Sequence, residues 1–514
     1  MTADALSAPE RWCAGLGRWS RLGLAFLAGA LLTAGHAPIG LPWLAFLALP
    51  LMVWLMVGSP SARVAAWTGW AAGFGYFVTG LHWVGNAFLV DPDRFLLLLP
   101  LGVLGLPAGL ALFWAVAFWG ARRIAFTGWR AALVLSTTLG AVELARGYVL
   151  TGFPWALPAY IWLDTPIMQT ASWIGPFTLT VLTLLVCAIP LTAEMRREVY
   201  PAALCLACVV ILFAVGWARL GEPEAPDSDQ PLIRLVQPNA PQHLKWEPGY
   251  REEYYDRLLK ASAAPSRTFD AKPDLILWPE MSVYFVPTEN LAEIARISEA
   301  AQGATVILGA FHRELRADGT FLTNAFHTIL PDGTLGPRYD KHHLVPFGEY
   351  MPLAGVLGSL GLPDFSEGAG FARGDGPMTM HLPGLPSFSP NICYESIFPY
   401  KVVGSERPEW IAQITNDAWF GSFAGPQQHL AQARFRAVEQ GLPVVRATNT
   451  GISAVIDGSG RIVASIDLHR YDSVDVRLPP PLSATVYSKT GDISCIVLLL
   501  IITASIFQMY RRSG

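Results

Sequence analysis

Charged residues are scarce in this chain of 514 residues. Asp, Glu, Lys and Arg make up 15% of it, against about a quarter of an ordinary soluble domain, whereas 52% is hydrophobic. This composition excludes a disordered chain, a coiled coil and a small disulfide scaffold. A formal net charge of −4 at pH 7 gives no excess of positive charge for binding nucleic acid. The composition therefore favours a membrane protein.

Cysteine is also scarce, and its distribution is uneven. Of the six cysteines, five lie in or beside apolar stretches, and only Cys393 lies in the more polar part of the chain. A structural disulfide within that part is therefore excluded. The thiol of Cys393 is either a small buried hydrophobic group, the usual fate of a free cysteine, or a reactive group. The other five are Cys13, Cys187, Cys205, Cys208 and Cys495.

Lysine is absent from residues 1–216, which carry eleven Arg and eight acidic residues. A helix needs about 20 mostly apolar residues to cross a hydrocarbon core about 30 Å thick. We therefore expect a membrane domain over 1–219 with seven spans, a soluble domain over 220–482, and a linker with an eighth span over 483–514. The expected spans are approximately 20–35, 41–58, 65–88, 95–119, 131–149, 167–191, 200–217 and 493–510.

Arginine placement orients these spans. With eight spans, most arginines fall on one side of the membrane, and only Arg94, Arg146 and Arg219 fall on the other. The positive-inside rule then puts both termini in the cytoplasm and the soluble domain outside it. A cleavable signal peptide is the alternative for the first span, but no A-x-A-like site follows it, so we favour an uncleaved helix. The arginines on the cytoplasmic side are Arg11, Arg18, Arg21, Arg63, Arg122, Arg123, Arg130, Arg196, Arg197, Arg511 and Arg512.

Short β-like runs alternate with helical patterns in the soluble domain, which predicts an α/β or layered α+β sandwich. The expected strands are 232–236, 275–278, 305–308, 325–330, 391–394, 410–415, 443–447 and 453–456. The expected helices are 251–264, 289–301 and 428–440, the last with Arg434, Arg436 and Glu439 on its surface. Residues 479–481, all proline, mark the linker back to the membrane.

Three residues that can carry out chemistry lie at or just beyond such strands: Glu280, Lys341 and Cys393. A thiol attacks only as a thiolate, so it needs a nearby base or cation. A carboxylate can take the thiol proton, and an ammonium can stabilise the anion that forms on an attacked carbonyl. Taken singly, each signal is weak, because a glutamate at a strand end or a lone lysine is more often a solvated surface group.

The local sequences around these residues are more specific together. Leu-Trp-Pro-Glu ends at Glu280, Tyr-Asp-Lys ends at Lys341, and Cys-Tyr-Glu begins at Cys393, so that the three lie 61 and 52 residues apart. This pattern resembles the nitrilase, or carbon–nitrogen hydrolase, superfamily. The resemblance implies an αββα sandwich with Glu280 as general base, Lys341 as oxyanion stabiliser and Cys393 as nucleophile.

The same resemblance implies supporting residues. Glu349 ends a Pro-Phe-Gly-Glu run after the lysine and is expected to orient Lys341 or share its charge. Tyr394 and Glu395 directly follow the nucleophile and are expected to help hold the site.

Further residues are expected to line the substrate site: Trp246, Asn324 and Phe365. An ordinary interfacial tryptophan is the alternative for Trp246. Phe365 and Phe371 lie in a glycine-rich segment and belong either to a mobile lid or to an ordinary surface loop. His342 and His343 lack the spaced ligands of a tetrahedral metal site, so no metal is expected.

The expected membrane spans limit which family of the superfamily the chain can resemble. A nitrilase-like domain between a seventh and an eighth span resembles the bacterial apolipoprotein N-acyltransferase family. Family-like stretches lie at 143–147, 151–155, 237–239, 245–246, 415–420, 446–451 and 487–492. The resemblance implies a membrane domain of about eight transmembrane helices joined to an extracytoplasmic αββα sandwich.

It also implies a two-step acyl transfer in the bacterial inner membrane, with the catalytic domain on the periplasmic side. Cys393 would take the sn-1 acyl chain of a phospholipid such as phosphatidylethanolamine as a thioester. The α-amine of a diacylglyceryl-cysteine at the N-terminus of an apolipoprotein would then accept the chain in a ping-pong mechanism. No cofactor, metal or nucleic acid is expected, and we expect a monomer.

Three other functions remain open. One is a membrane-anchored amidase that uses the same three residues with water as the acceptor. Another is acyl transfer to a glycolipid or other amine. The last is a non-catalytic receptor or transporter, although the spans hold few paired charges and no evident half-helix repeat.

Overall fold

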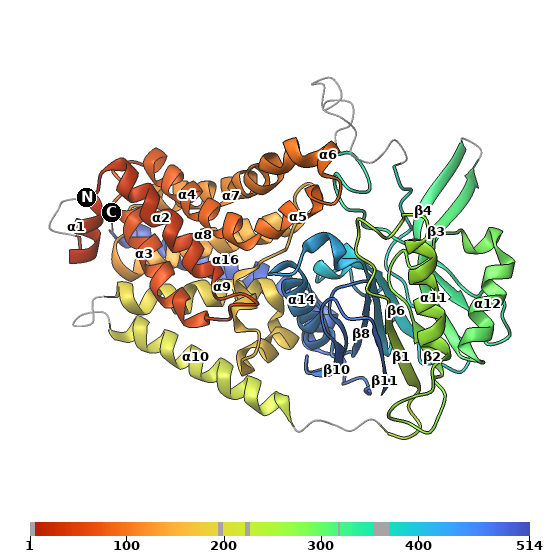
Figure 1. Ribbon diagram of the computed structural model, residues 1–514. Helices are drawn as coiled ribbons and strands as arrows, with labels where there is room; N and C mark the ends of the chain where they lie inside the picture. The colour runs from red at the N-terminus through yellow and green to blue at the C-terminus, as the bar shows by residue number, and fades with distance from the viewer. Residues whose placement is uncertain (1–5, 194–198, 222–226, 317–318, 353–369, 514) are drawn as a thin grey trace. The chain divides into compact units, whose positions relative to one another are not determined.

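The computed structural model describes residues 6–193, 199–221, 227–316, 319–352 and 370–513 (Figure 1). The chain folds as two compact units, which the backbone enters and leaves more than once. The helical unit comprises Met1–Glu222, Phe423–Gln440 and Ala484–Gly514, and the sheet unit comprises Pro223–Ser422 and Gly441–Ser483.

Helices build the first unit, and each of the eight expected spans overlaps one of them. These helices are α2 (Arg18–Thr33), α3 (Ala45–Val57), α4 (Ala62–Gly80), α7 (Leu106–Ile124), α8 (Gly128–Tyr148), α9 (Ala171–Thr192), α10 (Val199–Leu220) and α16 (Ile493–Ser513). Shorter helices are α1 (Ala8–Ala14), α5 (Gly85–Phe88), α6 (Pro92–Phe95), α14 (Gly425–Gln440) and α15 (Val486–Thr490).

Four helical stretches among the described residues are long and apolar enough to cross a membrane. They are Pro92–Ile124, Pro166–Thr192, Val199–Leu220 and Ile493–Arg512, which match the expected fourth, sixth, seventh and eighth spans. Helices α2 and α3 are shorter, with 16 and 13 residues, and α4 and α8 are rich in Gly, Ala and Thr. The total of eight spans therefore stays a prediction.

Small residues bring α2 and α4 into close contact. A Cβ on Gly29 would lie 1.9 Å from the carbonyl oxygen of Ala72, and one on Gly75 would lie 2.1 Å from that of Phe26. Close approach through small residues is typical of helices that pack inside a membrane, where no hydrophobic effect drives them together. A larger side chain at either glycine would force the two helices apart.

A buried ion pair on α8 fastens the chain that follows this helix. Arg146 and Glu143 pair at 2.5 Å, and Trp114 of α7 donates from Nε1 to Glu143 at 2.8 Å. Arg146 also donates to the backbone carbonyls of Phe153 and Trp155. Its guanidinium is therefore fully used inside the unit, as buried charges in membrane helices require.

Two β-sheets build the second unit. The first has six strands in the order β11-β1-β2-β3-β4-β5, and the second has five in the order β10-β9-β8-β7-β6. The strands are β1 (Leu232–Gln237), β2 (Leu275–Leu277), β3 (Thr305–Arg316), β4 (Gly319–Ile329), β5 (Tyr339–Asp340), β6 (Phe388–Ile392), β7 (Trp410–Thr415), β8 (Val444–Thr448), β9 (Ser453–Ile456), β10 (Ile462–Ile466) and β11 (Asp472–Arg477). In the first sheet the pairs β1–β2 and β2–β3 are parallel and the other pairs are antiparallel. In the second sheet β6–β7 and β7–β8 are parallel, and β8–β9 and β9–β10 are antiparallel.

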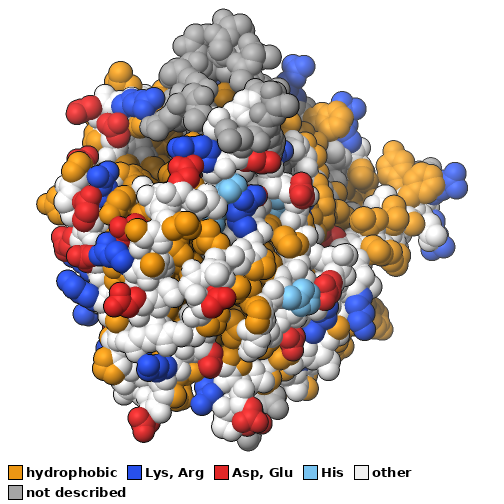
Figure 2. Space-filling model, turned by 90° about the vertical axis from the view of Figure 1, so that its right-hand side faces the viewer, with side chains coloured by type: hydrophobic (Ala, Val, Ile, Leu, Met, Phe, Trp, Pro, Cys, Tyr) orange, Lys and Arg blue, Asp and Glu red, His pale blue; other side chains and the backbone are white. Residues whose placement is uncertain are grey.

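The core of this unit lies between the two sheets. Leu235 and Leu277 of the first sheet share one buried cluster with Ile392 and Ile414 of the second. The other face of the first sheet is covered by α11 (Tyr250–Ala263) and α12 (Leu291–Ala301), which share a second cluster with β2 and β3 (Figure 1). Figure 2 shows charged side chains of both signs scattered over one face of the molecule. The sheets and their helices form the expected nitrilase-like sandwich.

The helix between β7 and β8 differs from the expectation. Its contacts group α14 with the helical unit, where Arg436 and Glu439 are fully buried and pair at 2.7 Å. Arg436 also donates to the hydroxyl of Tyr160 at 3.1 Å. The prediction that these two residues lie on the surface is therefore wrong, because the polar side of the helix packs against protein.

Most of the expected strands are confirmed, with local differences. The strand expected at 391–394 is wrong in its second half, because β6 ends at Ile392 and Cys393–Ile397 forms a 3₁₀ turn. Strands β5, β10 and β11 were not expected. Strand β11 alternates Asp and Ser with Val and is only partly buried, so its sequence lacks the apolar run by which a strand is recognised.

Candidate active site

Glu280, Lys341 and Cys393 meet at the ends of three strands of the sheet unit. Glu280 follows β2, Lys341 follows β5 and Cys393 follows β6, so residues far apart in sequence arrive at one edge of the sandwich. Lys341 donates from Nζ to Oε1 of Glu280 at 3.3 Å, and the electrostatic field of both groups acts on the Cys393 thiol. All three side chains are buried, so their charges interact through a medium of low polarity.

Two carboxylates hold the Lys341 ammonium. Nζ donates to Oε1 of Glu349 at 2.8 Å, a shorter contact than the one to Glu280. Burial alone would lower the pKa of Lys341, but the carboxylates of Glu349 and Glu280 outweigh burial and raise this pKa above its ordinary value. Lys341 is thus a fixed positive charge inside the site, which is what an oxyanion stabiliser requires.

The nucleophile candidate sits on a strained turn. Cys393 has a backbone φ of 51°, a left-handed conformation that non-glycine residues adopt rarely and at a cost of about 1–3 kcal/mol. Burial, and then the carboxylate of Glu280, raise the pKa of the Cys393 thiol, while Lys341 acts in the opposite direction. The resting thiol is therefore protonated at neutral pH and needs a base beside it. Glu280 is the carboxylate that the fold brings there.

Asn324 connects the two carboxylates. Its Nδ2 donates to Oε1 of Glu280 at 2.7 Å and to Oε1 of Glu349 at 3.0 Å. Each of these oxygens therefore receives one hydrogen bond from Asn324 and one from Lys341. Within the described residues the Oδ1 atom of Asn324 is buried without a hydrogen-bond partner. Asn324 thus belongs to the polar network of the site, and its contact with substrate stays a prediction.

Glu395 ties the nucleophile turn to the lysine loop. Oε2 accepts from the backbone N–H of Ile392 at 2.7 Å, and Oε1 accepts from the N–H of His342 at 2.7 Å and from the hydroxyl of Tyr339 at 2.8 Å. Burial alone would raise the pKa of Glu395, but the His342 side chain and the Ile392 N–H outweigh it and hold this pKa below its usual value. Glu395 is thus placed as a structural carboxylate.

The expected aromatic residues have different positions. Tyr394 is buried and packs against Phe398, with ring centroids 5.2 Å apart. Trp246 is 39% exposed and stacks on Phe311 at 6.3 Å, and Phe371 stacks on the same ring at 5.7 Å. Trp246, Phe311 and Phe371 therefore form a row of aromatic rings. Phe365 lies outside the described residues.

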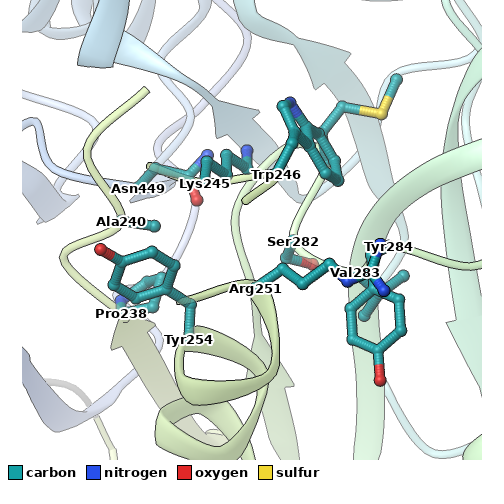
Figure 3. Close-up of a pocket in the computed structure, with 11 residues that line it drawn as sticks. Pro238, Ala240, Lys245, Trp246, Arg251, Tyr254, Ser282, Val283, Tyr284 and Asn449 are labelled. Atoms are coloured by element: carbon teal, nitrogen blue, oxygen red, sulfur yellow. The ribbon is translucent and has the colours of Figure 1, made fainter. Parts of the chain in front are cut away.

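Two polar residues beside Glu280 hold its backbone carbonyl, and the sequence did not predict this role. Lys245 and Asn449 come from distant segments and lie together in the pocket of Figure 3. Both donate to the backbone carbonyl of Glu280, Lys245 at 3.2 Å and Asn449 at 2.8 Å. Burial lowers the pKa of Lys245 to about 7, against the attraction of Glu280 and Cys393. No local sequence signal identifies these contacts, because they depend on tertiary packing.

Comparisons with known proteins identify relatives of both parts of the chain. A model of the apolipoprotein N-acyltransferase N-terminal domain matches residues 28–189, and one of the carbon-nitrogen hydrolase family matches residues 232–476. An apolipoprotein N-acyltransferase from Rhodopseudomonas palustris is 37% identical over 521 aligned positions that cover 96% of each chain. Another, from Bradyrhizobium diazoefficiens, is 39% identical and covers 96% of this chain and 95% of its own.

A solved amidase of the nitrilase superfamily from Nesterenkonia AN1 is 19% identical. It covers 50% of this chain and 94% of its own, with a TM-score of 0.33. The family assignment rests on the sequence relatives, whose similarity extends over nearly the whole length, and it confirms the resemblance expected from the motifs. The chain belongs to the apolipoprotein N-acyltransferase family.

Proposed function

We propose that this protein transfers an acyl chain from a membrane phospholipid to the N-terminal amine of diacylglyceryl-cysteine on apolipoproteins. The observation that carries the proposal is the buried group of Glu280, Lys341 and Cys393, in a chain of this family that also has membrane-capable helices. A base, a fixed cation and a thiol are together sufficient for acyl transfer without a metal.

In the first step, the Glu280 carboxylate takes the proton from the Cys393 thiol, and Sγ attacks the ester carbonyl of the sn-1 chain. The carbonyl oxygen becomes an oxyanion, which the Lys341 ammonium stabilises. Collapse of this intermediate breaks the bond to the glycerol oxygen, and Glu280 returns its proton to that oxygen. The lysophospholipid leaves, and the acyl chain remains on Cys393 as a thioester.

In the second step, the α-amine of the diacylglyceryl-cysteine attacks the thioester carbonyl. Lys341 again stabilises the oxyanion, and Glu280 takes a proton from the attacking nitrogen. Collapse breaks the carbon–sulfur bond, the proton returns to Sγ, and an amide is released. A thioester reacts readily with amines, so one thiol can serve two substrates in ping-pong order.

We also propose where the enzyme is located and what each part of the chain does. Residues 1–219 and 483–514 would anchor the chain in the bacterial inner membrane, and residues 220–482 would form the catalytic domain on the periplasmic side. Phosphatidylethanolamine is the proposed donor, and the active enzyme is proposed to be a monomer. The arginine-rich loops of the first domain support this orientation.

The test is a reconstituted transfer reaction. Full-length protein in vesicles of phosphatidylethanolamine is given a synthetic diacylglyceryl-cysteine peptide, and peptide and lipids are analysed by mass spectrometry. We expect one added acyl chain on the peptide amine and an equal amount of lysophospholipid, with neither product from Cys393→Ala. Free fatty acid with unmodified peptide would instead indicate a hydrolase that uses water.

A further inference from the structure

Three arginines converge on a hollow at one end of the helical unit. The hollow has a volume of about 690 Å³ and lies between the start of α4 and the end of α7. Arg63 belongs to the first turn of α4, and Arg122 and Arg123 belong to the last turn of α7. The remaining residues that line it are Pro60, Ser61, Ala62 and Trp119, none of them acidic.

The contacts of these arginines leave donors available. Arg122 is partly buried and donates from Nε to the backbone carbonyl of Ser59 at 2.9 Å. Arg123 lies over the ring of Trp119, with 4.8 Å between the guanidinium carbon and the ring centroid. Among the residues that the structure describes, none of the three arginines has a carboxylate at ion-pair distance. Arg122 and Arg123 are thus held by contacts within the unit, Arg63 is exposed, and no described carboxylate balances the charge of the three guanidinium groups.

The start of α4 adds to this positive charge. The first turns of helices carry N–H groups without partners in the helix and favour negative charge. In α4 the Ser61 hydroxyl accepts from one of them, the N–H of Val64, at 3.3 Å, and the first turn contains Arg63 and no acidic residue. Helix starts of this kind bind phosphate and similar anions. Guanidinium groups suit the same partner, because their planar N–H forks match phosphate oxygens. The hollow is therefore suited to binding an anion.

An apolar stripe on α7 leads to the hollow. Leu112, Val116 and Trp119 are spaced like residues on one helix face, and they are 59%, 59% and 44% exposed. Arg123 continues this face into the hollow. A ligand with a long apolar chain and an anionic head would bury its chain on the stripe and place its head among the arginines.

We propose that this hollow binds the phosphate group of an anionic phospholipid, whose acyl chain lies along the exposed face of α7. Basic pockets at helix ends are suited to such head groups, and tryptophan is common at the depth where head groups begin. The site contains none of the residues proposed for catalysis, so it would hold a structural or regulatory lipid. The inference is independent of the proposed acyl transfer.

The test compares lipid binding by full-length variants in detergent, measured by native mass spectrometry. The probes are phosphatidylglycerol, which is anionic, phosphatidylcholine, which has no net charge, and inorganic phosphate. The test variant replaces Arg63, Arg122 and Arg123 by Gln. The matched control replaces Arg511 and Arg512 by Gln, since these arginines are also at a helix end and Arg511 also stacks on an aromatic ring. Thermal unfolding without added lipid shows whether each variant is folded.

We expect the native protein and the control to prefer phosphatidylglycerol over phosphatidylcholine by about tenfold or more, and the test variant to lose this preference. Arg→Lys at the three positions should keep part of it. If the triple variant does not fold, Arg123→Gln alone should weaken the preference about threefold. An unchanged preference in the folded variants, or an equal loss in the control, would overturn the proposal. Binding of inorganic phosphate in place of the lipid would show a soluble ligand and would overturn the lipid assignment.

Discussion

Lys341 donates from Nζ to Glu349 at 2.8 Å, which is shorter than its 3.3 Å contact with Glu280. The closest counter-charge of the proposed oxyanion stabiliser is therefore a residue outside the proposed trio of base, cation and nucleophile. Glu349 also accepts at Oε2 from the backbone N–H of Val345 at 2.8 Å, which fixes its carboxylate from the other side. Because Glu349 balances much of the Lys341 charge, Glu280 is freer to take up and release a proton than it would be as the sole carboxylate beside the ammonium.

We therefore expect Glu349→Gln to lower kcat by about tenfold to a hundredfold while the protein stays folded. Glutamine keeps the size of the side chain but removes a carboxylate that raises the pKa of Lys341. The alkaline limb of the pH–activity profile should shift to lower pH for the same reason. Steady-state rates from about pH 6 to about pH 10 measure both effects. A variant with native kcat and an unchanged profile would contradict this role.

The thiol of Cys393 should react slowly with alkylating agents at neutral pH. Burial and the Glu280 carboxylate raise its pKa, so the thiolate is a minor species that increases about tenfold per pH unit. We expect the rate of iodoacetamide labelling, followed on the Cys393 peptide by mass spectrometry, to keep rising up to about pH 10. A plateau near neutral pH would contradict the buried, protonated thiol.

Glu395→Gln should destabilise the sheet unit. The carboxylate is buried and accepts hydrogen bonds from both the nucleophile turn and the lysine loop, so replacing it leaves donors poorly paired, at a cost of about 2–4 kcal/mol. The folded-state pKa of Glu395 is held below its ordinary value. Its stabilising effect is thus present above the unfolded-state pKa and is lost as pH falls through the folded-state pKa. Thermal unfolding in detergent should show a Tm gap between native and variant that narrows below about pH 4. A constant gap would contradict this account.

Lys245→Met should change the pH dependence of stability. Burial lowers the pKa of Lys245 from 10.5 to about 7, so between these values the folded protein binds fewer protons than the unfolded protein. Stability then rises with pH across this window in the native protein, by at most about 1.4 kcal/mol per pH unit, and the methionine variant lacks this contribution. Tm measured at intervals above neutral pH should therefore increase in the native protein relative to the variant. Parallel curves would show that the amine is not buried as described.

The sequence allowed the site to be predicted further than the fold around it. The local sequences around Glu280, Lys341 and Cys393 were sufficient to single these residues out, although strand β5 before Lys341 was not expected and Cys393 was expected within a strand and not after it. The contacts that hold the Glu280 carbonyl were not predictable. Lys245 and Asn449 have no local pattern that points to this carbonyl, and they meet only because the segments that carry them pack together.

The helix at 428–440 shows a second limit. Its apolar positions predicted a helix correctly, but the burial of Arg436 and Glu439 could not be seen. Charged residues on a helix are usually solvated, and a pattern of hydrophobic positions cannot reveal a polar partner such as Tyr160. The 3₁₀ turn at Cys393 was not predicted for a related reason. An apolar and aromatic run predicts a strand, and the pattern gives no sign that the site requires another conformation.

The central claim is that Cys393 carries an acyl chain taken from a phospholipid, and intact-protein mass spectrometry tests it most directly. Full-length native protein, Cys393→Ser and Cys393→Ala are each incubated with phosphatidylethanolamine alone, in detergent verified to keep the lipid accessible. We predict a mass increase of one acyl chain on the native protein that hydroxylamine removes, and no increase on Cys393→Ala. Native protein that stays unmodified, or an equal adduct on Cys393→Ala, would contradict acyl transfer through this thiol.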